Sequence, residues 1–434
     1  MRKNYNWIRA KKVIVGGNMF ISKRPDLYLP NSWPTYYKKA KGCYIWDLNG
    51  KKYTDFSMMG IGTNLLGYAR NEIDKEVIKK TKNGSMSTLN SFEEVLLAEQ
   101  LNKIHSWSEK VCFARTGGEA NAIAIRLSRA FTKKNKIAIC GYHGWHDWYQ
   151  SCNLKNKKNL NNYLMEGVST EGVPKELKNS TVTFKYNDID NFLKVTRKHN
   201  VGTVIMEAER SEKPQDFFLE KVREICDKKK IVLIFDECSS GFRENLGGIH
   251  LKHKVFPDLC TFGKALGNGY AISAVIGKEK IMKMGRKSFI SSTFWSEGIG
   301  PVAALKTLEI MKKEKPWKNI KNVGLQIKKF WKEISNTHKI PMVIQGMDAI
   351  PNFYIKSENF LKYKTFITQE MLKEKYLATN IVYISTKHNK EIFKNYKLKL
   401  EKIFDQLNNF EKGRLRINKF LKNGTSKLGF KRLN

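Results

Sequence analysis

An acidic pair and a lysine flanked by glycines are the residues of this sequence best suited to chemistry. Asp236 and Glu237 come directly after the apolar run Ile231–Phe235, and a carboxylate at the end of a buried strand is costly unless a cation pairs with it. Lys264 follows a second apolar run, Leu259–Phe262. A lysine on an exposed loop is the alternative; an interior lysine, in contrast, has a lowered pKa and can form a Schiff base.

Two further loops follow predicted strands and have the composition of ligand-binding turns. Thr116-Gly117-Gly118 opens a helix after Val111–Arg115, where glycine N–H groups and the helix N-terminus favour an anion, although an ordinary tight turn is the alternative. The loop Gly141–Trp148 suits stacking against a flat ligand or, alternatively, an aromatic core cluster. Its rings are those of Tyr142, His143, Trp145, His146 and Trp148.

Together these residues describe a site for pyridoxal phosphate (PLP). Asp236 would lie opposite the pyridinium nitrogen, and Lys264 would react with the aldehyde. The aromatic loop would cover the ring, and the turn at Thr116 would bind the phosphate.

The apolar runs predict the elements that position these residues. They are continuous rather than alternating, and helical patterns separate them, which is typical of a mostly parallel sheet with helices on both faces. In such an α/β fold, ligands bind beyond the carboxyl ends of the strands, where the candidate residues above are found. Strands are expected at 111–115, 136–140, 201–206, 231–236, 259–262 and 274–277, with helices at 117–131 and 217–229.

A change of pattern divides the chain. From about Gly300 onward, long lysine-rich helices dominate, and roughly the first 50 residues indicate a helix and a hairpin. We therefore expect a large cofactor-binding domain (56–310) and a smaller α+β domain built from both chain ends, 1–55 and 311–434. Strands of the C-terminal part are expected at 342–345, 353–355 and 381–385.

These motifs resemble those of the class III aminotransferases, a family of the PLP fold-type I superfamily, and within it the glutamate-1-semialdehyde 2,1-aminomutase-like branch. The resemblance covers roughly residues 10–310 and includes LIFDECSSGFR around Asp236 and PDLCTFGKALGNGY around Lys264. It implies a large domain with a mostly parallel sheet between helices, and a smaller α+β domain. Further similar segments are KGCYIWDLNGKKYTDF, TGGEANAIAIRLSRA, GYHGWHD and SSTFWSEGIGPVAALKTLE.

The resemblance implies a role for each matched residue. Lys264 would form the Schiff base with PLP and then move a proton between Cα and C4′, while Asp236 would keep the pyridine nitrogen protonated. Thr293 matches the position from which a neighbouring subunit donates a hydroxyl to the phosphate, which implies a homodimer with shared active sites. The other implied cofactor-binding residues are Thr116, Gly117, Gly118, Tyr142, His143, Glu207 and Cys238.

Departures from the family pattern leave the substrate open. Cys238 replaces the usual Val or Ile, Ala208 replaces the proline after Glu207, and the phosphate turn lacks one hydroxyl. The arginine that meets the substrate carboxylate in true aminomutases has Arg24 as its counterpart here. We expect substrate contacts from Arg24, Trp145 and Tyr383.

We therefore expect a PLP-dependent enzyme that moves an amino group between an amino-acid donor and a carbonyl acceptor through ping-pong half-reactions. A glutamate-1-semialdehyde 2,1-aminomutase that forms 5-aminolevulinate is the alternative. A decarboxylase or racemase is a less favoured alternative, because PLP fixes the electron sink and not the bond that breaks. A basic nucleic-acid-binding protein is a remote alternative that only the charge suggests.

The composition points to a chain that works without a nucleic acid, a metal or a membrane. Its 434 residues carry a net charge of +38, but the lysines are spread along the chain at the helical spacing of solvated faces. The seven cysteines never form C-x-x-C, and His143-x-x-His146 and His250-x-x-His253 lack further ligands, so we expect no disulfide or metal site. With no bilayer-length apolar run and no leader pattern, we expect a cytoplasmic protein.

Overall fold

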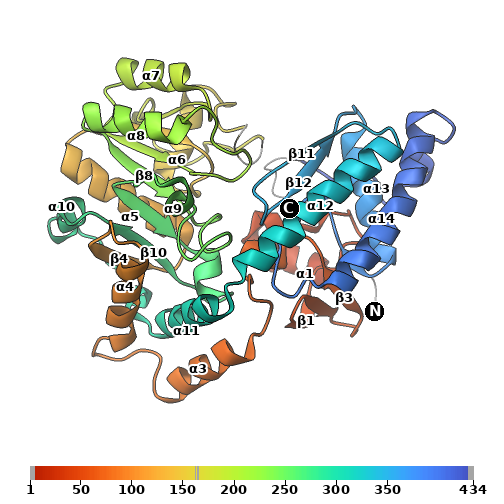
Figure 1. Cartoon of the computed structure of the whole chain (residues 1–434), viewed down its shortest axis with the longest axis horizontal. Coiled ribbons are helices and arrows are strands. Elements are labelled where there is room, and N and C mark those ends of the chain that lie inside the picture. The colour runs from red at the N-terminus through yellow and green to blue at the C-terminus, as the bar shows by residue number, and fades with distance from the viewer. Residues whose placement is uncertain (1–4, 162, 164–165, 429–434) are drawn as a thin grey trace. The chain divides into compact units, whose positions relative to one another are not determined.

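The computed structural model describes residues 5–161, 163 and 166–428, which divide into two compact units (Figure 1). The central unit comprises residues 71–317, and the terminal unit comprises the described residues of 1–70 and 318–434. Residues 1–4, on which the expectation of no leader partly rests, lie outside the described residues. The domain boundaries expected after residues 55 and 310 stay predictions.

A seven-stranded sheet forms the middle of the central unit. Its strand order is β4 (Lys110–Ala114), β10 (Ser273–Gly277), β9 (Leu259–Phe262), β8 (Val232–Asp236), β7 (Thr203–Met206), β5 (Ile137–Cys140) and β6 (Thr181–Thr183). β10 pairs antiparallel with both β4 and β9, and the pairs from β9 to β6 are parallel. The predicted mostly parallel sheet is confirmed.

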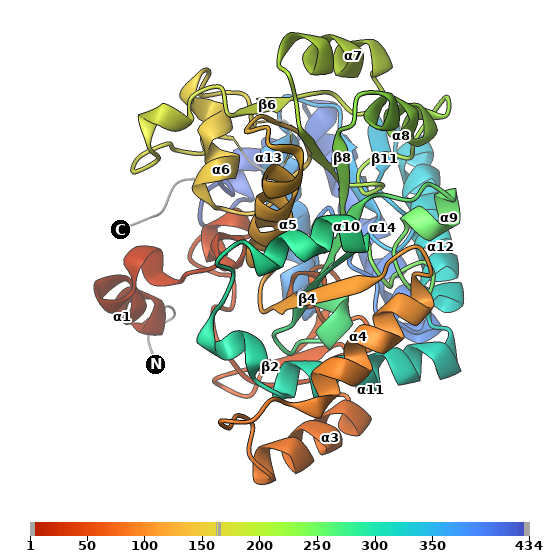
Figure 2. The same ribbon diagram turned by 90° about the vertical axis from the view of Figure 1, so that its left-hand side faces the viewer.

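Helices cover both faces of this sheet. α5 (Gly117–Thr132) packs against β4, β7, β8, β9 and β10 (Figure 2), and Val232 and Ile234 share its apolar cluster. Leu233 and Phe235 point to the opposite face because side chains alternate along a strand. α8 (Phe218–Lys228) packs against β8, and none of its side chains belongs to the apolar cluster of α5, so it covers this opposite face. The other helices are α3 (Asn71–Lys82), α4 (Phe92–Ile104), α6 (Asp147–Gln150), α7 (Ile189–Lys198), α9 (His250–His253), α10 (Glu279–Met282) and α11 (Ile299–Glu314).

Strands from both ends of the chain form one sheet in the terminal unit. Its order is β1 (Tyr37–Lys41), β2 (Tyr44–Asp47), β3 (Lys52–Asp55) and β13 (Tyr376–Leu377). β13 pairs in parallel with β3, so the C-terminal part extends the N-terminal meander. The unit also contains the pair β11 (Met342–Gln345) and β12 (Asn352–Ile355) and the helices α1 (Tyr5–Val13), α2 (Met59–Gly62), α12 (Trp317–Thr337, from its second residue), α13 (Phe360–Lys373) and α14 (Lys390–Glu411).

Most predicted elements are present with small shifts of their ends, but the strand expected at 381–385 is wrong. There the N–H groups of Val382 and Tyr383 bond to the carbonyl oxygens of Pro351 and Ser57, in two different segments, so no regular ladder forms. The short strand β6 was not expected, because three residues carry too little pattern to detect. Among the described residues, no helix is both long and apolar enough to span a bilayer.

Candidate functional site

Asp236 ends β8, and donors from other elements surround its carboxylate. Oδ2 accepts hydrogen bonds from Asn121 Nδ2 at 2.7 Å and from His143 Nδ1 at 2.8 Å. Oδ1 accepts one from the N–H of Cys238 at 3.0 Å. Asn121 lies on α5 and His143 follows β5, so the sheet and the helix on its face bring together residues that are far apart in the chain.

One acceptor position of this carboxylate remains for a ligand. Thr261 Oγ1 lies 3.3 Å from Asp236 Oδ1 but 2.8 Å from Asn121 Oδ1, and its single proton goes to the nearer acceptor. A carboxylate has about four acceptor positions, and the three donors above fill three of them. The Cys238 thiol also interacts with this carboxylate, but a thiol is a weak donor, so the fourth position is open to a stronger one.

The environment keeps Asp236 ionised. Burial by itself raises the pKa of this carboxyl, but the hydrogen bond and charge of His143, then the Cys238 N–H and the Asn121 amide, outweigh it and lower the pKa to about 2. A buried, ionised carboxylate with one acceptor position left fits a cationic N–H donor. A protonated pyridine nitrogen is such a donor.

Lys264 follows β9, the strand next to β8. Its backbone has a φ of 42°, in the left-handed region that a residue with a Cβ adopts at a cost of about 1–3 kcal/mol and that is frequent at functional sites. The amine donates a hydrogen bond to Ser239 Oγ at 2.6 Å. The acid and the amine therefore belong to the segments that leave two neighbouring parallel strands.

The turn at the start of α5 is organised as a helix cap. Thr116 Oγ1 accepts from the N–H of Glu119, and the Glu119 carboxylate accepts from the N–H groups of Arg115 and Thr116. The Thr116 hydroxyl is thus engaged in the cap. The N–H groups of Gly117 and Gly118 have no acceptor within the helix, and this helix end favours an anion.

Cys238 fills a narrow space between two glycines. A Cβ on Gly117 would lie 2.9 Å from Cys238 Sγ, and one on Gly263 would lie 3.6 Å away. Burial first, and then the charge of Asp236, raise the pKa of this thiol well above its ordinary value. Cys238 therefore stays protonated and packs as a small apolar side chain between the turn and the segment before Lys264.

The aromatic loop after β5 contains residues with different surroundings. His143 bonds to Asp236, whereas Tyr142 is half-buried with its ring edge-on to Tyr149 at 5.8 Å. Trp148 belongs to the apolar core cluster, so the aromatic-core interpretation applies to it. Trp145 is 68 % exposed and is the most exposed ring of this loop.

Glu207 follows β7 and forms an ion pair with Arg210, with Nη1 and Oε1 2.9 Å apart. Both side chains line a cavity together with Gly141 and Lys185. A Cβ on Gly141 would lie 2.9 Å from Glu207 Oε2, and the φ of Gly141 is 132°. The loop that carries Tyr142 and His143 therefore requires glycine where it passes Glu207.

The three remaining predicted residues lie in other surroundings. Thr293 is exposed on the central unit. Arg24 and Tyr383 are buried in the terminal unit, where Arg24 makes a bidentate pair with Asp26 at 3.0 and 2.6 Å. A carboxylate of its own unit thus already neutralises Arg24.

Glu237, His250 and Cys260 form a group of possible metal ligands, with ligand atoms within 4.8 Å of one another. His250 Nδ1 lies 2.7 Å from Glu237 Oε1, and His250 Nε2 accepts from Trp107 Nε1 at 2.9 Å. The other oxygen of Glu237 accepts from the N–H of Ile249. Both imidazole nitrogens are used, so the group anchors the segment between β8 and α9.

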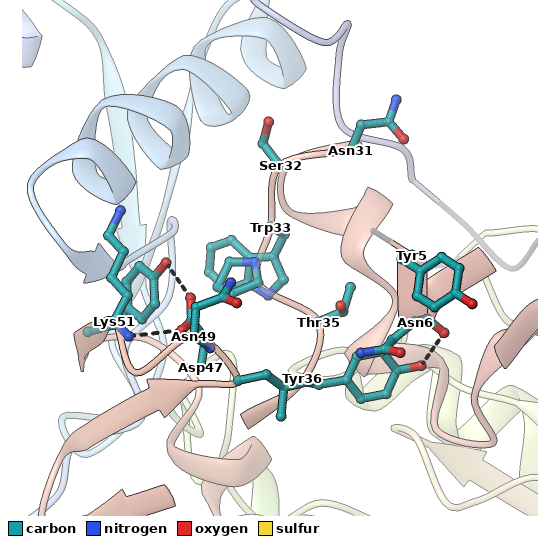
Figure 3. A pocket seen from close by; sticks show the side chains of 13 residues that line it. Tyr5, Asn6, Asn31, Ser32, Trp33, Thr35, Tyr36, Asp47, Asn49 and Lys51 are labelled. Carbon is teal, nitrogen blue, oxygen red and sulfur yellow. Dashed lines mark hydrogen bonds between the residues drawn. The ribbon is translucent and has the colours of Figure 1, made fainter. Parts of the chain in front are cut away.

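A separate hollow of the terminal unit is shown in Figure 3, lined by Tyr5, Trp33, Tyr36 and further polar residues. Its acid, Asp47, accepts hydrogen bonds from the N–H groups of Asn49 and Lys51 and from the hydroxyl of Tyr53. Asp47 therefore anchors the β2–β3 turn.

A parallel sheet with an ionised aspartate after one strand, a lysine after the next and an anion-binding helix start defines the class of PLP-dependent fold-type I enzymes. The chain matches the family described as aminotransferase class-III over residues 29–385. It belongs to this family, and its cofactor is pyridoxal phosphate. It is a PLP-dependent transaminase or aminomutase.

Three known proteins illustrate the similarity. The 3-aminobutyryl-CoA aminotransferase of Cloacimonas acidaminovorans is 33% identical over 83% of this chain and 85% of that protein. The glutamate-1-semialdehyde 2,1-aminomutase of Saccharolobus islandicus is 26% identical over 92% of this chain and 96% of that protein. The FumI protein of Sphingopyxis sp. MTA144, solved with PLP, has the same fold, with a TM-score of 0.85, 24% identity and coverage of 97% and 99%.

Four residues of the site were missed from the sequence: Asn121, Thr261, Ser239 and Arg210. Asn121 had a detectable signal, because it is the one amide among the mostly apolar buried residues of α5. Ser239 and Thr261 had none, since a hydroxyl next to a strand end is common and its partner depends on the fold. Arg210 stands in a basic sequence where one more cation carries little information.

Proposed function

We propose that this chain is an aminotransferase that moves an amino group between an amino-acid donor and a carbonyl acceptor, with Lys264 as the reacting amine. The observation that carries the proposal is the Asp236 carboxylate, which is buried, has a pKa of about 2 and retains one acceptor position. PLP, when bound, supplies an electron sink. Asp236 would hold a proton on the pyridine nitrogen, because it is charged at neutral pH and can accept that N–H.

The surrounding residues would orient the reactants. The Lys264 amine takes up and returns the proton of the substrate Cα, and the N–H groups of Gly117 and Gly118 bind the phosphate. Tyr142 would cover one ring face, and Cys238 would pack against the other. Glu207 fixes the approach of the Tyr142 loop through its contact with Gly141.

An aminomutase acting on glutamate 1-semialdehyde is the second candidate, and the relative from Saccharolobus islandicus supports it. Arg24, the counterpart of the aminomutase arginine, argues against it because Asp26 already pairs with its guanidinium. Incubation with glutamate 1-semialdehyde distinguishes the two: 5-aminolevulinate would establish the aminomutase, and its absence together with turnover of a donor and acceptor would exclude it.

We also propose a homodimer in the cytoplasm. Phe289 and Phe294 are exposed apolar side chains on the segment of Thr293. Leu89 and Phe92 are exposed on the segment that follows Ser85, whose carbonyl oxygen accepts from the N–H of Gly298. Such a patch favours an interface with a second copy. All seven cysteines are free thiols, as is usual in a reducing compartment. A solution mass of one chain would overturn the dimer.

Borohydride reduction of the PLP-loaded protein tests the role of Lys264. The wild type should be yellow, and mass spectrometry after reduction should place the cofactor on Lys264. Lys264→Ala should lose both the colour and the transamination of every donor in a screen. Lys278→Ala is the matched control, because Lys278 also follows a strand of this sheet but pairs with Asp258 at 2.7 Å. A colourless wild type after loading would refute the proposal.

A further inference from the structure

We propose that Ser239 is a positioning residue for Lys264, whose hydroxyl holds the lysine amine in place whenever that amine is not attached to the cofactor. The inference rests on the role proposed for Lys264 and adds the group that controls where its amine goes. Lys264 Nζ and Ser239 Oγ are 2.6 Å apart. This is the short end of hydrogen-bond distances, as expected when the donor is an ammonium group.

The serine is itself held rigidly. It is 5 % exposed, and its carbonyl oxygen accepts from Arg243 Nε. On its C-terminal side, Ser240 Oγ donates to Glu237 Oε2 at 2.9 Å, and the N–H of Gly241 donates to the carbonyl oxygen of Glu237 at 2.9 Å. Since Glu237 is also bound by His250, the turn is anchored to a buried network. The hydroxyl therefore keeps a fixed position.

The lysine is constrained from its own backbone. Gly263 precedes it, and the φ of 42° at Lys264 sets the direction in which its side chain leaves the chain. A long lysine side chain otherwise samples many rotamers, and ordering it costs conformational entropy. A buried hydroxyl at the far end selects the rotamers that keep the amine at the site.

A serine suits this task chemically. Its hydroxyl can accept a hydrogen bond from an ammonium group and can donate one to a neutral amine, so it binds Lys264 before and after a proton transfer. It carries no charge and does not compete with Asp236 for the cofactor nitrogen. Ser239 thus differs from Cys238 and Ser240 on either side, whose side chains bond or pack elsewhere.

Ser239→Ala in the apoenzyme gives the first test, with Lys264 labelled by an amine-reactive reagent at fixed pH and followed by mass spectrometry. Loss of the acceptor should make Lys264 label about tenfold faster, the effect of one hydrogen bond to a charged group. Ser240→Ala is the matched control from the same turn and should label at the wild-type rate. Ser239→Thr, which keeps the hydroxyl, should restore slow labelling.

The loaded enzyme gives the second test. Ser239→Ala should lower kcat about tenfold with little change of KM, and it should shift the pH dependence of the visible absorbance of the bound cofactor. Equal labelling and equal spectra in Ser239→Ala and the wild type would overturn the inference while leaving the proposed function intact. Equal changes in Ser240→Ala would also overturn it, because the turn and not the hydroxyl would then be responsible. A wild type that carries no cofactor on Lys264 would refute the proposed function itself, and the apoenzyme labelling would still test the Ser239 contact.

Discussion

Each compact unit contains a buried aspartate at the end of a strand, and the pKa values of these two carboxyls are shifted in opposite directions. Asp236 ends β8 in the central unit, and its pKa is lowered to about 2. Asp55 ends β3 in the terminal unit, and its pKa is raised above the ordinary value. Both are less than 5 % exposed, so burial alone does not explain the difference.

The partners explain it. Asp55 accepts hydrogen bonds from the N–H groups of Ser57, Met58 and Met59 and from the hydroxyl of Tyr68, which are neutral donors and do not outweigh the cost of burial. Asp236 has an imidazole among its donors. Asp55 therefore holds a turn, whereas Asp236 is kept charged for a cationic ligand.

Asp236→Asn should produce the largest effect. The amide keeps the shape but cannot hold a proton on the ring nitrogen by its charge, so kcat should fall on the order of 10²- to 10³-fold in a steady-state assay with the preferred donor. Asp55→Asn is the matched variant, and it should lower the melting temperature while preserving the absorbance of the bound cofactor. Equal loss of that absorbance in both variants would contradict the distinction between the two aspartates.

The sequence was sufficient for the carboxylate and the lysine but not for what surrounds them. Apolar runs mark buried strands, so residues at their carboxyl ends could be predicted, and Asp236, Lys264 and His143 indeed lie there. Asn121 reaches Asp236 through the way α5 lies across the sheet, and Thr261 reaches it through the register of β8 and β9. No local pattern specifies that arrangement.

The terminal unit was harder to predict for the same reason. The segment 381–385 has the apolar composition of a strand, yet its N–H groups bond to irregular segments from distant parts of the chain. Arg24, which was expected to meet a substrate, pairs with the nearby Asp26, and its contact with a substrate stays a prediction. For the segment 381–385, tertiary partners decide the outcome.

His143→Phe should make Asp236 more like Asp55 in the apoenzyme. The lowered pKa of Asp236 contributes about 2 kcal/mol of stability, which is fully present above about pH 4, the ordinary value, and is lost as the pH falls through about 2. The phenylalanine removes the donor, so urea unfolding should show a deficit of about 1–2 kcal/mol at pH 6 that narrows toward pH 3. A deficit that is constant with pH would indicate packing alone.

Tyr68→Phe should have an effect no larger than that of His143→Phe, and its pH dependence should follow Asp55 instead of Asp236. Tyr68 donates to Asp55 Oδ2 at 2.7 Å, so its loss should cost about 1–2 kcal/mol at pH 7. Because the folded-state pKa of Asp55 is raised, this carboxyl takes up its proton earlier in the folded than in the unfolded protein as the pH falls, which relieves the cost of its burial. The deficit of Tyr68→Phe in urea unfolding should therefore shrink from pH 7 toward pH 4, at a higher pH than the deficit of His143→Phe. Tyr53→Phe, which removes a hydroxyl from the half-buried Asp47, should cost less than about 1 kcal/mol at every pH. A Tyr68→Phe deficit that persists at pH 4 and narrows only in the range where the His143→Phe deficit narrows would contradict the raised pKa of Asp55.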